Sequence, residues 1–203
     1  MKNPMLEIRP LQNSDCPAVA SAHATCLRTP FNTWGGVRLL QAHYEILTRQ
    51  QGGICFVAQV NSQFAGFVCG IWDHHVINEL NRRKPLRLAL YSLEHMLEHP
   101  SQLGENLRAY FLRRAGAIPY PEGYELRPIV VLPQFRGQGV ADRLVERLIQ
   151  DAGERGYDQI FLYTEADNLP AIRFYTRFGF VLRETPDESA RMFQYFIQEN
   201  QRA

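Results

Sequence analysis

The sequence predicts an α/β fold in which helices flank a mixed β-sheet. Short apolar, β-prone runs alternate along the chain with amphipathic runs of helical period. In the last third, the order strand, helix, strand, helix implies a parallel crossover. The 203 residues are enough for one domain with a sizeable core and too few for two comfortable ones. We therefore expect a single domain over residues 1–203.

The elements are predicted by apolar runs bounded by turn residues. Apolar, β-prone composition predicts strands over 6–11, 54–60, 64–72, 124–133, 158–164, 179–185 and 191–197. Helical spacing of apolar side chains predicts helices over 13–27, 37–51, 139–156 and 167–180, the first capped by Asn13 or Ser14. The short polar segment between the second and third strands predicts a hairpin.

Residues 73–123 interrupt this pattern between the third and fourth strands. Leu86, Leu90, Leu93 and Leu97 recur with helical period, and the segment is too apolar for a disordered linker. We expect a helical insertion that packs on the same core and not a second domain.

Composition and charge indicate which kinds of partner the protein binds and in which cellular compartment it is expected. A formal net charge of +1 argues against broad attraction to nucleic acid or to an anionic membrane. No apolar run is long enough to span a bilayer, and the N-terminus lacks the apolar core of a signal peptide. We expect a cytoplasmic protein, and a homodimer is compatible with the sequence. Free thiols are expected at the scattered cysteines, which are Cys16, Cys26, Cys55 and Cys69.

The stretch PQFRGQGVADRLVERL (133–148) predicts an anion site. A strand leads into a glycine-bearing loop and then a helix, whose first turn offers unpartnered N–H groups and the positive end of the helix dipole. Gly137 and Gly139 would let a phosphate lie against the backbone. The P-loop pattern does not fit, because neither Lys nor Ser/Thr follows the glycines. The dinucleotide pattern fits only in its first half, since Asp142 takes the third glycine position and would repel a pyrophosphate if it faced inward.

Two motifs together resemble the GCN5-related N-acetyltransferase (GNAT) superfamily. The pattern Arg-x-x-Gly-x-Ala at 136–141 resembles the superfamily's signature at the helix that holds the pyrophosphate of coenzyme A. Further along, DNLPAIRFYTRFGF (167–180) resembles a second signature through Asn168, Ala171, Tyr175, Gly179 and Phe180. The resemblance is specific over 124–182 and implies a partly splayed sheet, an acetyl-CoA co-substrate and acetyl transfer to a primary amine.

The resemblance also implies the cofactor-binding residues. Those implied are Ile129, Val130, Val131, Arg136, Gly137, Gln138, Gly139, Val140, Ala141, Asn168 and Tyr175. The oxyanion donor is implied to be a backbone N–H near Val131. Pro128, which has no N–H, fits either an interrupted strand ladder there or an edge strand. Asn168 could equally serve only as a helix cap.

Tyr175 and Glu125 are the implied catalytic residues. Tyr175 resembles the superfamily's proton donor to the departing thiolate, and the alternative is a core tyrosine with a satisfied hydroxyl. Glu125 resembles its general base, and the alternative is a solvated carboxylate at a strand end. The branch that acetylates ribosomal proteins uses a different glutamate, and Tyr163 stands at that position here. Since neither motif contains cysteine, we expect direct transfer within a ternary complex.

The acceptor is left open by the sequence. The implied acceptor is an unidentified small-molecule or peptidyl amine, and the alternative function is a non-catalytic acyl-CoA-binding or sensing module of the same fold. Phe31, Trp34, Tyr120 and Tyr124 could form an aromatic wall or simply pack. No metal is expected, because neighbouring side chains in WDHH (72–75) point to opposite sides of an extended segment.

Overall fold

The structure is a computed structural model that describes residues 5–27, 36–49, 52–73, 90, 123–183 and 190–197. The chain forms two compact units. One contains Met1–Arg9, Phe56–Trp72 and Glu122–Ala203, and the other contains Pro10–Cys55 and Asp73–Pro121. The predicted insertion over 73–123 lies outside the described residues, apart from its two ends and Leu90.

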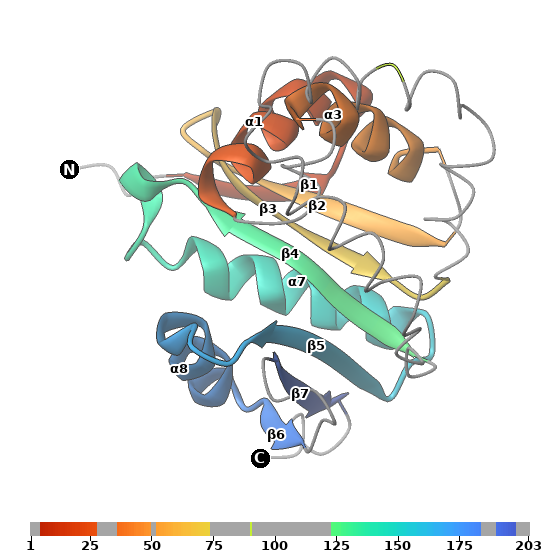
Figure 1. The fold of residues 1–203 in the computed structure, drawn as a ribbon, viewed down its shortest axis with the longest axis vertical. Coiled ribbons are helices and arrows are strands. Elements are labelled where there is room, and N and C mark those ends of the chain that lie inside the picture. Colours follow the sequence, from red (N-terminus) through yellow and green to blue (C-terminus); the bar gives the residue numbers. More distant parts are fainter. Residues whose placement is uncertain are drawn as a thin grey trace. The chain divides into compact units, whose positions relative to one another are not determined.

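A seven-stranded mixed sheet is the central feature of the chain (Figure 1). Its order is β1-β2-β3-β4-β5-β7-β6, and the predicted run of β4, helix and β5 is a parallel crossover. The other pairings with a described register, β3–β4, β5–β7 and β6–β7, are antiparallel. Every predicted strand is confirmed: β1 (Leu6–Pro10), β2 (Gly53–Val60), β3 (Gln63–Ile71), β4 (Tyr124–Val131), β5 (Gln159–Glu165), β6 (Val181–Arg183) and β7 (Ala190–Phe196).

The predicted hairpin joins β2 and β3 through a two-residue turn. Asn61 and Ser62 both have positive φ, at 50° and 64°. Two consecutive positive φ angles define the type I′ turn, whose twist matches that of paired strands. The short polar segment is therefore sufficient to reverse the chain.

Two helices of the second unit pack on each other. They are α1 (Cys16–Cys26), which follows the short helix η1 (Asn13–Asp15), and α3 (Gly36–Leu47). The predicted cap at Asn13 or Ser14 is wrong by one residue, because the helical turn begins at Asn13 and the Gln12 N–H donates to the Asp15 carboxylate at 2.8 Å. Between the helices, His23 Nδ1 and the Tyr44 hydroxyl lie 2.6 Å apart in a buried hydrogen bond.

Both long helices of the first unit cover one face of the sheet. The helix α7 (Val140–Glu154) packs on β3, β4 and β5 with its predicted apolar residues buried. Contacts between Tyr195 on β7 and Phe178 place α8 (Leu169–Phe178) on the same face, since Tyr195 pairs with Ile160 and Ile160 with Tyr124. Figure 1 shows α7 running along the strands, with α8 near β5 and β7.

Tyr124 is part of the core beneath α7. Its buried hydroxyl donates to the Asp151 carboxylate at 2.9 Å, and its ring stacks on Trp72 with centroids 5.5 Å apart. Asp151 also accepts from Arg155 at 2.7 Å. Of the two alternatives left open for Tyr124, an acceptor wall or packing, the structure supports packing, and the other three aromatic candidates lie outside the described residues.

The cysteines differ from the expectation. Cys16 and Cys26 are free thiols as predicted, but Cys55 and Cys69 are disulfide-bonded. Cys55 lies on β2 and Cys69 on the neighbouring strand β3, and both are buried. The two cysteines are far apart in the sequence and form no CxxC pattern. They lie on neighbouring strands only because β2 pairs with β3. Among the described helices, none has the length and apolar character that crossing a bilayer requires.

Candidate functional site

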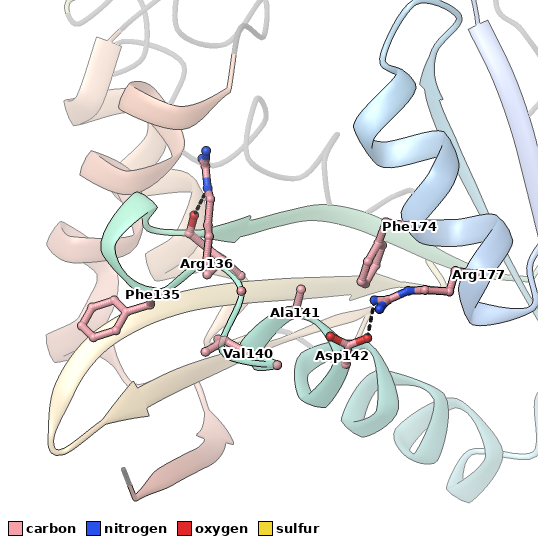
Figure 2. Close-up of a pocket in the computed structure, with 10 residues that line it drawn as sticks. Phe135, Arg136, Val140, Ala141, Asp142, Phe174 and Arg177 are labelled. Atoms are coloured by element: carbon pink, nitrogen blue, oxygen red, sulfur yellow. Dashed lines mark hydrogen bonds and ion pairs between the residues drawn. The ribbon is translucent and has the colours of Figure 1, made fainter. Parts of the chain in front are cut away.

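A cavity of about 420 Å³ lies where the glycine loop enters α7 (Figure 2). The two sequence motifs, well separated in the chain, both contribute to its wall. From the loop and helix come Val131, Phe135, Arg136, Gly137, Gly139, Val140, Ala141 and Asp142, and from α8 come Phe174 and Arg177. The cavity is therefore built by the β4–α7 junction and closed on one side by α8.

The loop backbone requires glycine at two positions. Gly137 and Gly139 have φ of 74° and 76°, in the left-handed region that other L-residues rarely adopt. A Cβ built at either position meets no atom within 4 Å. The backbone conformation requires glycine here, and the space over both residues stays open to a ligand.

The first turn of α7 opens on this space. Gly139 is its N-cap and supplies no side chain to bond the turn's N–H groups. Those groups have no partner within the helix and carry the positive end of its dipole. The junction therefore has the chemistry of an anion site, as the sequence predicts.

Side chains of the loop brace its backbone. The Arg136 Nε donates to the Val131 carbonyl at 3.1 Å, which ties the loop to the end of β4 (Figure 2). The Gln138 amide donates to the Gln134 carbonyl at 3.0 Å and does not line the cavity. The Gln138 side chain is thus used within the loop and does not reach the cavity.

The strand β4 carries a bulge and parts from β5. Register with β3 shifts between Val68 and Gly70, so that β4 has one extra residue around Arg127 and Pro128. Pairing with β5 occurs only at Tyr124 and Glu125 among the described residues of the two strands. Of the two alternatives for Pro128, an edge strand or an interrupted ladder, the structure shows the interrupted ladder, and the sheet is splayed beyond Glu125.

The backbone N–H groups of β4 point alternately toward β3 and toward the gap between β4 and β5. The Leu132 N–H donates to the carbonyl of Ala65, a residue of β3, at 2.9 Å. Because N–H directions alternate along a strand, Val130 also faces β3, whereas Ile129 and Val131 face the edge that β5 has left. Two of the three predicted strand residues thus present free-edge amides, and Val131 also lines the cavity.

Tyr175 is buried on α8, with 6% of its surface exposed. Its ring contacts Phe174, Phe180 and Phe193, with centroids 5.3 to 6.1 Å apart. No described residue hydrogen-bonds its hydroxyl. Burial raises the pKa of Tyr175 above its ordinary value, so the hydroxyl keeps its proton at neutral pH. A protonated hydroxyl in an apolar setting, with no partner among the described residues, is available to a ligand.

Glu125 lies near the start of β4 on the face opposite α7 and α8. Strand alternation sets this placement, since the neighbouring Tyr124 points to α7. Its carboxylate is buried and forms an ion pair with the Arg127 Nε at 2.9 Å. Burial raises the pKa of Glu125, and the nearby Arg127 opposes that shift. A solvated carboxylate at the strand end, the alternative, does not describe this residue.

Asn168 serves as the N-cap of α8. Its side-chain oxygen accepts from the Ala171 N–H at 3.2 Å, which satisfies one open donor of the first turn. The amide nitrogen of the same side chain is not used by this bond.

Four of the described cavity residues were not predicted as ligands from the sequence: Phe135, Asp142, Phe174 and Arg177. Arg177 forms an ion pair with Asp142 at 2.7 Å. The α8 motif fixes Tyr175 in register, and the spacing of Phe174 and Arg177 at i, i+3 puts both on one side of that helix. This spacing is the signal that could have suggested them.

Comparisons with known proteins agree with this arrangement. The sequence model of the Acetyltransferase (GNAT) family matches residues 18–180. The mycothiol acetyltransferase of Corynebacterium aurimucosum is 37% identical over 60 residues, which is 30% of this chain and 20% of that protein. The N-alpha-acetyltransferase 30 of Schizosaccharomyces pombe is 32% identical over 69 residues, or 34% of this chain and 42% of that protein. The chain thus spans 20% and 42% of the length of these two curated relatives.

Solved structures share the fold. A PaiA N-acetyltransferase from Thermoplasma acidophilum, solved in complex with coenzyme A, superposes with a TM-score of 0.58 at 14% identity. The match covers 95% of this chain and 99% of that one.

Proposed function

Since the chain belongs to the GNAT acetyltransferase family, we propose that it is an acetyl-CoA-dependent N-acetyltransferase acting on a primary amine. The observation that carries the proposal is the cavity at the start of α7, where both family motifs line one space. Open first-turn amides, two glycines with positive φ and Arg136 suit the diphosphate of coenzyme A. A solved structure of the same fold contains coenzyme A.

The splay beside β4 suits the pantetheine arm and the thioester. The amides of Ile129 and Val131 face the edge left by β5. An extended arm could pair with them as a strand would. An N–H at this edge would then donate to the thioester oxygen as negative charge develops on it. Asn168, at the start of α8, contributes its free amide nitrogen to the same arm in this proposal.

Glu125 and Tyr175 would act from opposite faces of the sheet. The amine nitrogen attacks the thioester carbonyl carbon, a C–N bond forms, and the C–S bond breaks to release the thiolate. Glu125, directly or through water, accepts the proton that the amine loses, and its raised pKa makes it a stronger base than an ordinary carboxylate. Tyr175 gives its proton to the thiolate. The thioester in the splay would be reached from both sides.

The first experiment places a side chain in the diphosphate cradle. Gly139→Val should abolish acetyl-CoA binding measured by calorimetry, because the valine side chain enters open space that the cofactor needs. Gly156→Val is the matched control. Gly156 also has positive φ, at 84°, with open space around it, but it follows the other end of α7.

Both variants should lose a similar amount of stability, since each forces a β-branched residue into a positive φ. Only Gly139→Val should lose the cofactor. Equal acetyl-CoA affinity in the two variants would remove the basis of the assignment. Release of free coenzyme A by the wild type in the presence of an amine panel then tests turnover, and binding without turnover on any amine would favour the acyl-CoA-sensing alternative.

A further inference from the structure

We infer that Arg177 is a ligand of the donor's diphosphate, held over the cofactor cavity by Asp142. This inference rests on the proposed function and adds a residue to its cofactor site. Arg177 projects from α8 across the cavity mouth, and its Nη2 donates to the Asp142 carboxylate at 2.7 Å (Figure 2). Both side chains line the cavity.

The position of Asp142 raises a problem for phosphate binding. The Asp142 carboxylate lies in the first turn of α7, where its negative charge interacts favourably with the positive end of the helix dipole when the cavity is empty. The same charge would repel a diphosphate that binds the same amides. A lone Asp142 would therefore weaken binding of the ligand for which the loop is suited.

Arg177 neutralises the charge of Asp142 and keeps further N–H donors for a diphosphate. A guanidinium has five N–H donors in one plane, and the bond to Asp142 uses the Nη2 end. Within the described part of the chain, Asp142 is its only hydrogen-bond partner. The guanidinium also lies over the Phe174 ring, 5.6 Å from its centroid, which restricts where its other donors point.

Exposure argues against a purely structural role. The side chains of Arg177 and Asp142 are 66% and 37% exposed. Ion pairs this open to water contribute little to folding, because solvent screens the charges. The pair is better explained by the hydrogen-bond donors that Arg177 presents to an anion in the cavity, where Arg136 is the other cationic residue among the described lining residues.

The test compares three ligands that all contain the pantetheine unit and differ in their phosphate groups. Coenzyme A has both the diphosphate and the 3′-phosphate, 3′-dephospho-coenzyme A has only the diphosphate, and pantetheine has neither. Arg177→Gln should weaken the first two by about 10-fold in Kd by calorimetry, the size expected for one charge-assisted hydrogen bond in a partly exposed site. Pantetheine affinity, followed by ligand-observed NMR, should not change. Arg173→Gln, an exposed arginine of the same helix that does not line the cavity, is the control and should bind all three as wild type does.

The substitution Asp142→Asn tests whether Arg177 binds the diphosphate itself or only neutralises the charge of Asp142. Removing the carboxylate's charge should leave coenzyme A affinity equal or tighten it by up to about threefold, because repulsion is lost. Arg177→Gln should still weaken binding at least about threefold in the Asp142→Asn background. No effect in that background would mean that Arg177 only neutralises Asp142, and it would overturn the inference.

The remaining outcomes are equally decisive. Weakening of coenzyme A but not of the dephospho form would assign Arg177 to the 3′-phosphate and overturn the diphosphate assignment. Equal weakening of pantetheine would reduce Arg177 to a structural role. Normal wild-type binding of coenzyme A with no effect of Arg177→Gln sinks this inference alone, whereas a wild type that binds none of the three ligands sinks the proposed function with it.

Discussion

Two buried tyrosines on the same side of the sheet differ in the state of their hydroxyls. Tyr124 donates to Asp151 at 2.9 Å, whereas no described residue bonds the hydroxyl of Tyr175. Burial raises the pKa of both. Residue type and burial are thus shared, and only the hydrogen-bond partner distinguishes a structural tyrosine from one available to a substrate.

This difference predicts opposite effects of the same substitution. Tyr175→Phe should lower kcat by about 10²-fold, the low end for loss of a general acid, because a thiolate is already a tolerable leaving group. Its melting temperature and acetyl-CoA affinity should stay near wild type. Tyr124→Phe should instead cost about 1–3 kcal/mol of stability, since a buried acceptor loses its donor, and should leave kcat unchanged. Thermal melts and turnover on the same preparations check both, and a fully active Tyr175→Phe would remove this residue from the mechanism.

The sequence predicts some residue-scale features and not others. Gly137 and Gly139 were predicted because their chemistry follows from a local pattern, Arg136 was implied by the family resemblance, and all three line the cavity. The sequence left Tyr124 open between an acceptor wall and packing, because strand alternation alone does not say which face a helix will cover, and the structure supports packing. The Asp142–Arg177 pair joins separate helices, and no local rule anticipates it.

At the scale of elements, the sequence predicts the strands and the four described long helices correctly. Periodicity and turn residues are local, and they fix where each element begins and ends within a few residues. Pairings that depend on tertiary approach were missed. The disulfide-bonded Cys55 and Cys69 lie on neighbouring strands, and the Gln12–Asp15 bond moved the first helical turn.

The contact between α1 and α3 makes a prediction about pH. Burial lowers the pKa of His23 to about 4, from an ordinary value of 6.5. The folded state therefore excludes a proton that the unfolded chain binds below pH 6.5, so stability is complete above that pH and declines as the pH falls toward 4. Denaturant melts of the wild type should show an extra loss of about 2–3 kcal/mol between pH 7 and 4.5. His23→Gln, which has no such titration, should lack that extra loss, and parallel profiles for the two proteins would contradict the assignment.

At the scale of the molecule, the sheet separates the two halves of the proposed chemistry. Beyond Glu125, β4 and β5 no longer pair, so the sheet is open between them. Tyr175 and the cavity lie with α7 and α8, and Glu125 lies on the opposite face. The resemblance implied the splay, and the bulge and the lost pairing confirm it. The single domain over residues 1–203 stays a prediction.

The insertion predicted over 73–123 should govern the acceptor and not the cofactor. Among the described residues, those that line the cavity lie in 131–142 and 174–177. Replacing residues 82–116 by a short Gly/Ser turn should therefore leave the Kd for acetyl-CoA within about threefold of wild type, less than the tenfold change expected for one lost charge-assisted bond. The amines that support release of coenzyme A should change, because this segment leads into β4, the strand that borders the splay. Circular dichroism and gel filtration first establish that the shortened protein is folded and soluble. A parallel loss of acetyl-CoA affinity in folded protein would show that the segment builds the cofactor site as well.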